Sequence, residues 1–93
     1  MTVHVEIVGD QQAITVVTLD RPERRNALDH ETLGELTQVL ADAAGRPTRV
    51  LILTGASGHF CAGADLQGVE DATFATLLQG VLDRLVNVSF PTI

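Results

Sequence analysis

The hydrophobic period changes repeatedly along this chain, and the order of those changes restricts the fold more than any other feature. Val3, Val5 and Ile7 alternate with polar residues, and β-branched residues return at 13–19, which predicts a β-hairpin. Residues 50–53 form a short, wholly apolar run, typical of a strand covered on both faces. Helical spacing follows each of these regions. The order of two strands, a helix, a strand and a helix predicts an α/β fold.

The first predicted helix begins after Asp29, a residue suited to cap its N-terminus. Glu31 in the first turn complements the positive end of the helix. Gly45 is expected to take the left-handed conformation that closes a helix, and Pro47 prevents any continuation. One face should be buried, comprising Leu33, Leu36, Val39, Leu40 and Ala43.

A second amphipathic helix is predicted over about residues 71–87, with a stripe that is more typical of a core or a subunit contact than of a ligand pocket. Residues 90–93 then begin another strand. Residues 1–93 are therefore expected to be the N-terminal part of a single domain that is truncated at its C-terminal end. The expected stripe is Phe74, Leu77, Leu78, Val81, Leu82, Leu85 and Val86.

Charge and cysteine content exclude several classes of function. The net charge of −6 disfavours nucleic-acid binding, because phosphate contacts need clustered cations. The single cysteine, Cys61, excludes a disulfide scaffold. Neither a signal peptide nor a membrane-spanning stretch is visible, so we expect a cytoplasmic location and no membrane partner. The cluster of Arg21, Arg24 and Arg25 is large enough to hold one phosphate group.

The glycine-rich segment after residue 54 predicts a loop that turns sharply or approaches another group closely. A dinucleotide-binding loop would need glycines at the positions of His59 and Cys61. A phosphate-binding P-loop needs a lysine, and a serine-hydrolase elbow needs glycine two residues after Ser57. The glycines alone leave a structural turn between strand and helix as an alternative.

Two segments together resemble the crotonase, or enoyl-CoA hydratase/isomerase, family. Residues 19–28, L-D-R-P-E-R-R-N-A-L, resemble the family's N-R-P-x-x-x-N-A-L segment, with Asp20 where asparagine is usual. Residues 53–55, L-T-G, and 60–66, F-C-A-G-A-D-L, resemble its L-T-G and F-x-A-G-A-D-L segments. The resemblance covers essentially the whole chain and implies the N-terminal portion of the family's ββα spiral.

The same resemblance implies acyl-CoA thioester chemistry, with Ala64 as the catalytic residue because its backbone N–H would be one donor of an oxyanion hole. Coenzyme A would be part of the substrate, with no separate cofactor and no metal. Homotrimers or dimers of trimers are expected. The matched substrate-binding candidates are Arg24, Arg25, Ala62, Gly63, Asp65 and Leu66; for Arg24 and Arg25 a merely solvated loop remains an equal alternative.

The reaction itself stays open at this stage. Enoyl-CoA hydration is favoured because it is common in the family, and isomerisation, thioester hydrolysis, decarboxylation or non-catalytic acyl-CoA binding are alternatives. The second oxyanion donor and the acid/base carboxylates are expected after Ile93. Cys61 is interpreted as a buried small thiol rather than a nucleophile. His4, His30 and His59 lack the spacing of metal ligands, and His59 is assigned to the loop.

Overall fold

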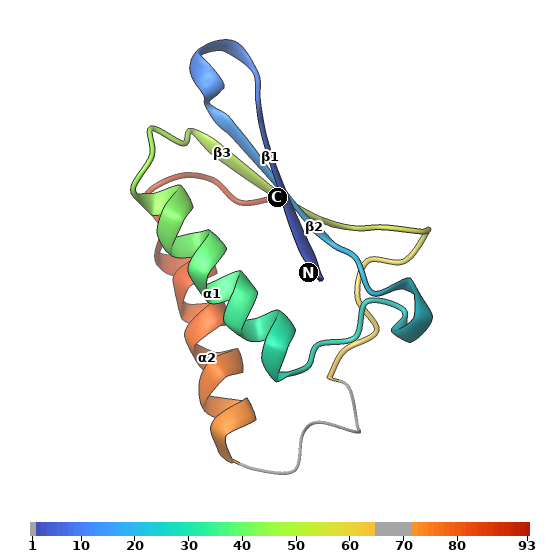
Figure 1. The fold of residues 1–93 in the computed structure, drawn as a ribbon. Coiled ribbons are helices and arrows are strands. Elements are labelled where there is room, and N and C mark those ends of the chain that lie inside the picture. Colours follow the sequence, from blue (N-terminus) through green and yellow to red (C-terminus); the bar gives the residue numbers. More distant parts are fainter. Residues whose placement is uncertain (1, 65–71) are drawn as a thin grey trace.

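The computed structural model describes residues 2–64 and 72–93, which form a three-stranded sheet with two helices (Figure 1). The strands are β1 (Val3–Val8), β2 (Ile14–Leu19) and β3 (Val50–Gly55), and the helices are α1 (His30–Ala44) and α2 (Ala72–Asn87). Short 3-10 turns, Asp10–Gln12 and Pro22–Arg24, follow β1 and β2. The predicted element order and the hairpin are therefore confirmed.

The sheet has the order β1-β2-β3, with β1 antiparallel to β2 and β2 parallel to β3. Helix α1 makes the crossover between the two parallel strands. Residues 91–93 lie parallel to β3, where the Leu53 N–H donates to the Ile93 carbonyl at 2.8 Å and the Ile93 N–H donates to the Leu51 carbonyl at 2.9 Å. The predicted start of another strand is confirmed.

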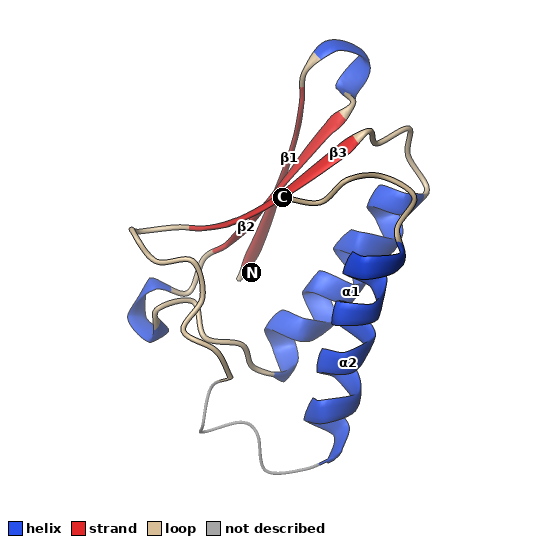
Figure 2. Ribbon diagram, turned by 180° about the vertical axis from the view of Figure 1, so that it is seen from behind, coloured by secondary structure: helices blue, strands red, loops and turns tan. Residues whose placement is uncertain are grey.

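Both helices lie on the same face of the sheet (Figure 2), so the apolar core has a single layer of helices on one side. The predicted inward residues of α1 are buried except Val39, which is partly buried. Asp29 caps the helix, since its side chain accepts the Thr32 N–H at 2.9 Å. The fully or nearly fully buried apolar side chains include Val3, Val17, Leu19, Leu33, Leu36, Leu40, Ala43 and Leu51.

Three predictions about packing are wrong in detail. Among the described residues, both helices cover the same face of β3, so Leu51 is buried while Val50 and Ile52 are only partly buried. Gly45 is right-handed, at φ −84° and ψ −4°, because the helix closes through bonds from its N–H to the Ala41 and Asp42 carbonyls.

The third error concerns α2, whose predicted stripe is too wide. Phe74 and Val81 are buried, but Leu82 is 47% exposed and Val86 is 80% exposed. The reason is that α2 packs along α1, so only the side of α2 that faces α1 and the core is covered. The three other stripe residues, Leu77, Leu78 and Leu85, are partly buried.

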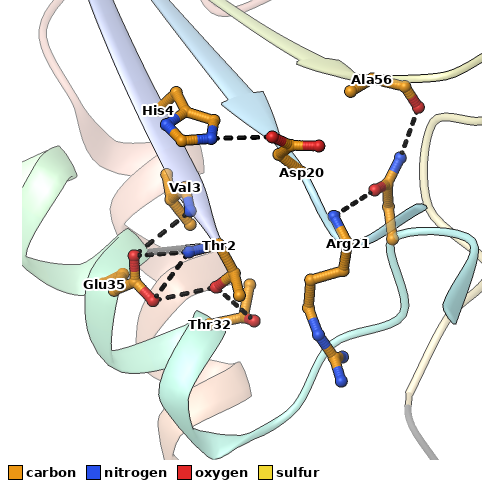
Figure 3. Close-up of polar contacts among 9 residues, drawn as sticks. Thr2, Val3, His4, Asp20, Arg21, Thr32, Glu35 and Ala56 are labelled. Carbon is orange, nitrogen blue, oxygen red and sulfur yellow. Dashed lines mark hydrogen bonds and ion pairs between the residues drawn. The ribbon is translucent and has the colours of Figure 1, made fainter. Parts of the chain in front are cut away.

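Polar contacts fix the two ends of the sheet. The Glu35 carboxylate of α1 accepts the N–H groups of Thr2 and Val3, at 3.1 and 3.2 Å, and the Thr2 hydroxyl at 2.9 Å (Figure 3). At the opposite end, the buried Thr48 hydroxyl donates to the Ala43 carbonyl at 2.9 Å and lies 3.3 Å from the Thr15 hydroxyl. Within the residues that the structure describes, no helix is long and apolar enough to cross a membrane.

Candidate functional site

The two segments that carry the family resemblance leave the sheet from neighbouring strand ends. Leu19 at the end of β2 is paired with Gly55 at the end of β3. Because the carboxyl ends of parallel strands meet at one edge of a sheet, the following segments, residues 20–28 and 56–64, start side by side. They stay together as far as Leu28 and Ala64, which form a parallel bridge. The fold thus joins two motifs that are far apart in the sequence.

The first segment has an irregular backbone. The turn Pro22–Arg24 is followed by Arg25 at φ 52° and Asn26 at φ 60°, two consecutive non-glycine residues in the left-handed region. Asparagine tolerates this region better than most residues, whereas arginine has no such preference. The Arg21 N–H donates to the Asn26 Oδ1 at 2.7 Å, and the Asn26 N–H donates back to the Arg21 carbonyl at 2.8 Å. These reciprocal bonds hold the tight turn.

The Asn26 side chain also reaches the second segment. It is 1% exposed, and its Nδ2 donates to the Ala56 carbonyl at 3.0 Å and to the His59 carbonyl at 2.8 Å. In Figure 3 the Asn26 side chain is the unlabelled amide with dashed hydrogen bonds to Arg21 and Ala56. All the main hydrogen-bonding positions of the amide are engaged, so a single buried side chain ties the two segments together.

Gly55 allows the second segment to fold back over the end of β3. A Cβ atom at this position would lie 2.1 Å from the His59 carbonyl oxygen and 2.3 Å from that of Phe60. No side chain fits there. Gly58 at φ 85° and Gly63 at φ 110° make the remaining sharp turns. The prediction that this loop turns sharply or approaches another group closely is confirmed. The loop does both, and the group approached is its own backbone.

The direction of the Ala64 amide follows from one hydrogen bond. The Leu28 N–H donates to the Gly63 carbonyl at 2.8 Å. The peptide that joins Gly63 to Ala64 is trans, so its N–H points opposite to its carbonyl and away from Leu28. No described residue accepts a hydrogen bond from this N–H, and Ala64 is exposed. The amide can donate to an acceptor from outside.

A hollow of about 280 Å³ lies beside this loop. Arg25, His59, Phe60, Cys61 and Ala62 line it, and the Ala62 N–H is held by the Arg25 carbonyl at 3.1 Å. An apolar cavity of about 180 Å³ lies on the core side and shares Phe60 and Cys61 with the hollow. The loop at residues 60–61 thus separates a hollow of mixed polar and apolar lining from an apolar cavity.

The structure brings together some of the predicted site residues. Arg25 and Ala62 line the hollow, and Gly63 and Ala64 follow directly in the chain. Arg24 is partly buried in the 3-10 turn and does not line the hollow. Asp65 and Leu66 lie outside the described residues.

Arg21 and Asp20, which lie near the site, have structural partners. Arg21 is engaged by the Ala27 carbonyl and by Asp29, whose carboxylate is 3.3 Å away. Asp20, which stands where the family usually has asparagine, pairs with His4 at 2.8 Å (Figure 3). Within residues 2–64 and 72–93, no three His, Cys, Asp or Glu side chains gather as metal ligands would.

Three features of the site correct or extend the sequence analysis. Cys61 is only partly buried, because the hollow and the cavity lie on its two sides. From the sequence, Asn26 was only one residue of a motif, and the bonds of its side chain to the second segment were not predicted. Its type was a usable signal, since asparagine favours the left-handed region. Nothing in the sequence separates Gly55, which must accommodate a carbonyl oxygen, from the other glycines of the loop.

Comparisons with known proteins agree with this geometry. Residues 9–93 match the family described as enoyl-CoA hydratase/isomerase. The Mycobacterium tuberculosis protein named "Probable enoyl-CoA hydratase echA6" is 47% identical over 66% of this chain and 25% of its own length. The mouse protein named "Enoyl-CoA hydratase domain-containing protein 2, mitochondrial" is 37% identical over 94% of this chain and 32% of its own length. The chain thus spans a quarter to a third of these relatives.

Solved structures show the same fold. An enoyl-CoA hydratase from Thermoplasma volcanium superposes with a TM-score of 0.86 at 30% identity, over 99% of this chain and 38% of that protein. An enoyl-CoA hydratase from Bacillus anthracis gives a TM-score of 0.84 at 26% identity, again over 99% of this chain and 38% of that one. The described chain is therefore an α/β unit of the crotonase fold. With the family match over residues 9–93, it belongs to the enoyl-CoA hydratase/isomerase family.

Proposed function

We propose that this chain supplies the oxyanion-binding loop of an acyl-CoA thioester enzyme, with enoyl-CoA hydration as its reaction. The observation that carries the proposal is the Ala64 N–H. It points away from Leu28, because the Gly63 carbonyl of the same peptide accepts the Leu28 N–H, and it donates to none of the described residues. Family membership adds the substrate class, because the relatives are named as enoyl-CoA hydratases.

The chemistry needs such a donor. When a nucleophile adds to an enoyl thioester, or a proton leaves the carbon next to the carbonyl, negative charge develops on the carbonyl oxygen as an enolate. A fixed N–H aimed at that oxygen stabilises the charge without reorganising during the reaction. The small side chains of Ala62 and Ala64 let a thioester approach the backbone. A second donor and the acid/base carboxylates are proposed to lie after Ile93, as the family resemblance implies.

The hollow beside Arg25 suits the phosphate-bearing end of coenzyme A. The chain as a whole is acidic, with a net charge of −6, so a local cation is needed to hold an anionic ligand. Arg25 is exposed and lines the hollow together with His59 and Ala62. Its planar guanidinium matches the geometry of a phosphate. We assign Arg25, rather than Arg24, to this contact because Arg24 does not line the hollow.

The test is water addition to crotonyl-CoA by the full-length protein, followed through loss of the conjugated double bond. Turnover that saturates with crotonyl-CoA is the expected result. Tight binding of crotonyl-CoA without turnover would instead support the alternative, a non-catalytic acyl-CoA-binding relative. Turnover of a different CoA ester, by isomerisation, hydrolysis or decarboxylation, would keep the oxyanion role of Ala64 and replace hydration as the reaction.

Self-association is part of the proposal. Leu82 and Val86 of α2 and Ile93 leave apolar surface exposed, at 47%, 80% and 77%. Leu82 and Val86 lie four residues apart on α2 and so are neighbours on its surface, and neighbouring exposed apolar side chains are typical of protein–protein contacts. We propose a homotrimer or a dimer of trimers, and the molar mass of the full-length protein measured by light scattering checks it. A monomer would contradict this part of the proposal.

A further inference from the structure

The Asn26 side chain makes a connection within the candidate site for which the family resemblance implies no role. The backbone joins the two segments at the Ala62 N–H, which donates to the Arg25 carbonyl at 3.1 Å, and at the Leu28 N–H, which donates to the Gly63 carbonyl at 2.8 Å. Asn26 lies between Arg25 and Leu28 in the sequence. Its amide adds the two bonds to Ala56 and His59, at the beginning of the loop.

These bonds hold the loop at both of its ends from one short stretch of chain. Residues 56–59 are held by the Asn26 Nδ2 group, and residues 62–63 are held by the backbone on either side of Asn26. A change in the Asn26 turn therefore moves the attachment points of the whole loop together. The direction of the Ala64 N–H depends on the last of these attachments, the bond from Leu28 to Gly63.

Few residue types can replace asparagine at position 26. The side chain must accept one hydrogen bond from the Arg21 N–H and donate two to carbonyl oxygens, and its backbone must be left-handed. A carboxylate accepts but cannot donate, so aspartate would face the Ala56 and His59 carbonyl oxygens with negative charge. An apolar residue would leave three partly buried backbone groups without this partner. Asparagine meets both demands.

We propose that Asn26 is a positioning residue for the thioester chemistry of this site, acting through the loop to aim the Ala64 amide. The inference rests on the proposed oxyanion role of Ala64 and goes beyond it, because it assigns the aim of that amide to a side chain that does not touch the substrate. A purely structural role for Asn26 makes a different prediction, namely lower stability with unchanged chemistry in the folded protein.

The experiment compares Asn26→Asp with Thr48→Val in the full-length protein. Asn26→Asp preserves shape and the left-handed preference but removes the two donated bonds. Thr48→Val removes a buried hydroxyl that bonds Ala43 and contacts Thr15, away from the loop. It is the matched control for loss of buried hydrogen bonding. Asn26→Gly, which also suits the left-handed backbone, is the second variant and keeps the test decisive where the aspartate variant does not fold.

Two readouts separate positioning from stability. The first is the ultraviolet absorbance of acetoacetyl-CoA, whose enolate fraction on the protein reports oxyanion stabilisation directly. The second is the split between kcat and KM for crotonyl-CoA. We expect Asn26→Asp to lower the enolate fraction and to lower kcat about 10²-fold, the size of effect that a 1 Å misplacement causes, with KM little changed. Thr48→Val should leave both readouts at the wild-type level in the folded protein.

The outcomes are distinguishable. A wild-type protein that neither turns over crotonyl-CoA nor enolises acetoacetyl-CoA overturns the proposed function, and this inference with it. A wild-type protein that does enolise acetoacetyl-CoA, together with folded Asn26 variants that enolise it equally well, overturns the inference alone. Equal losses of kcat in Asn26→Asp and Thr48→Val would also overturn it, since they would trace to stability.

Discussion

The helix-covered face of the sheet and the loop edge at the ends of β2 and β3 are held together by different physics. Beneath α1, side chains such as Val17, Leu33 and Leu51 are fully buried, and the contacts are apolar and non-directional. At the loop edge, Ala62, Gly63 and Ala64 are exposed, and hydrogen bonds and positive φ angles fix the backbone.

This fold therefore separates the residues that stabilise it from those that set the geometry of the candidate site. Apolar burial tolerates small shifts, because its free energy follows the area removed from water. A backbone N–H that must meet a carbonyl oxygen tolerates much less, because hydrogen bonds weaken steeply with misalignment. Core variants should therefore change the free energy of unfolding and leave the chemistry intact, and variants at the loop edge should do the reverse.

The largest effect should come from the core. Leu40 on α1 is 2% exposed, and Leu40→Ala should lower the free energy of unfolding by about 2–5 kcal/mol through lost burial and the cavity that remains. Denaturant unfolding of the full-length protein measures it. Exposed Gln38→Ala on the same helix is the control and should stay within about 0.5 kcal/mol. A fall in kcat for the fully folded Leu40→Ala variant would contradict the proposal that core residues affect stability and not the chemistry.

Ala64→Pro is the corresponding variant at the loop edge. It deletes the N–H and should lower kcat by about 10²–10³, the usual cost of losing one oxyanion donor. Ala64→Gly keeps the N–H and should lose much less. Steady-state kinetics with crotonyl-CoA measure both, and the thermal midpoint should change little because Ala64 is exposed. Equal kinetic losses in the two folded variants would count against the amide's role.

Gly55→Ala tests whether the loop edge is as precise as its geometry suggests. The added Cβ would lie 2.1 Å from the His59 carbonyl oxygen, so the loop must move by about 1 Å. A displacement of that size should lower kcat about 10²-fold. Gly34→Ala is the matched control, because nothing lies within 4 Å of its Cβ position on α1, and it should stabilise the helix by about 0.4–1 kcal/mol. Unchanged kinetics for Gly55→Ala would show that the loop tolerates displacement.

The smallest expected effect concerns ligand binding at the loop edge. Arg25→Glu should raise KM for a CoA ester about tenfold, equivalent to 1.4 kcal/mol, and leave KM for a pantetheine thioester without the nucleotide unchanged. Reversing the charge of Arg24 in addition should raise KM for the CoA ester little further, since Arg24 does not line the hollow. Exposed Arg49→Glu controls for net charge. Equal rises in KM for both thioesters would place Arg25 away from the phosphates.

The sequence predicted the regular elements well because their signals are local. α1 was predicted from apolar residues at helical spacing and from Asp29, whose capping bond to the Thr32 N–H lies within one turn. The closure at Gly45 was predicted in the wrong conformation, since a glycine permits both the left-handed and the right-handed ending and the choice depends on the following residues. The width of the α2 stripe was overestimated because periodicity shows which face is apolar and not how much of it is covered.

The candidate site was predictable only in part. Family resemblance led to Gly63 and Ala64, and glycine content predicted a sharp loop. The bonds from Asn26 to Ala56 and His59 join residues 30 and 33 positions apart, so no local pattern reveals them. The same holds for Gly55, whose need to be glycine comes from carbonyl oxygens that fold back over it.

The order of strands and helices, the acidic charge and the family could all be predicted from the sequence alone, because these depend on composition, periodicity and short motifs. The three-dimensional fold was needed to show that the Ala64 N–H points away from Leu28, that Arg25 rather than Arg24 lines the hollow, and that Asn26 joins the two motifs. These features could not be predicted because they depend on contacts between distant residues. In a trans peptide, for example, the partner of the carbonyl sets the direction of the N–H. Here that partner is Leu28, and the parallel pairing of β2 with β3 brings it to Gly63.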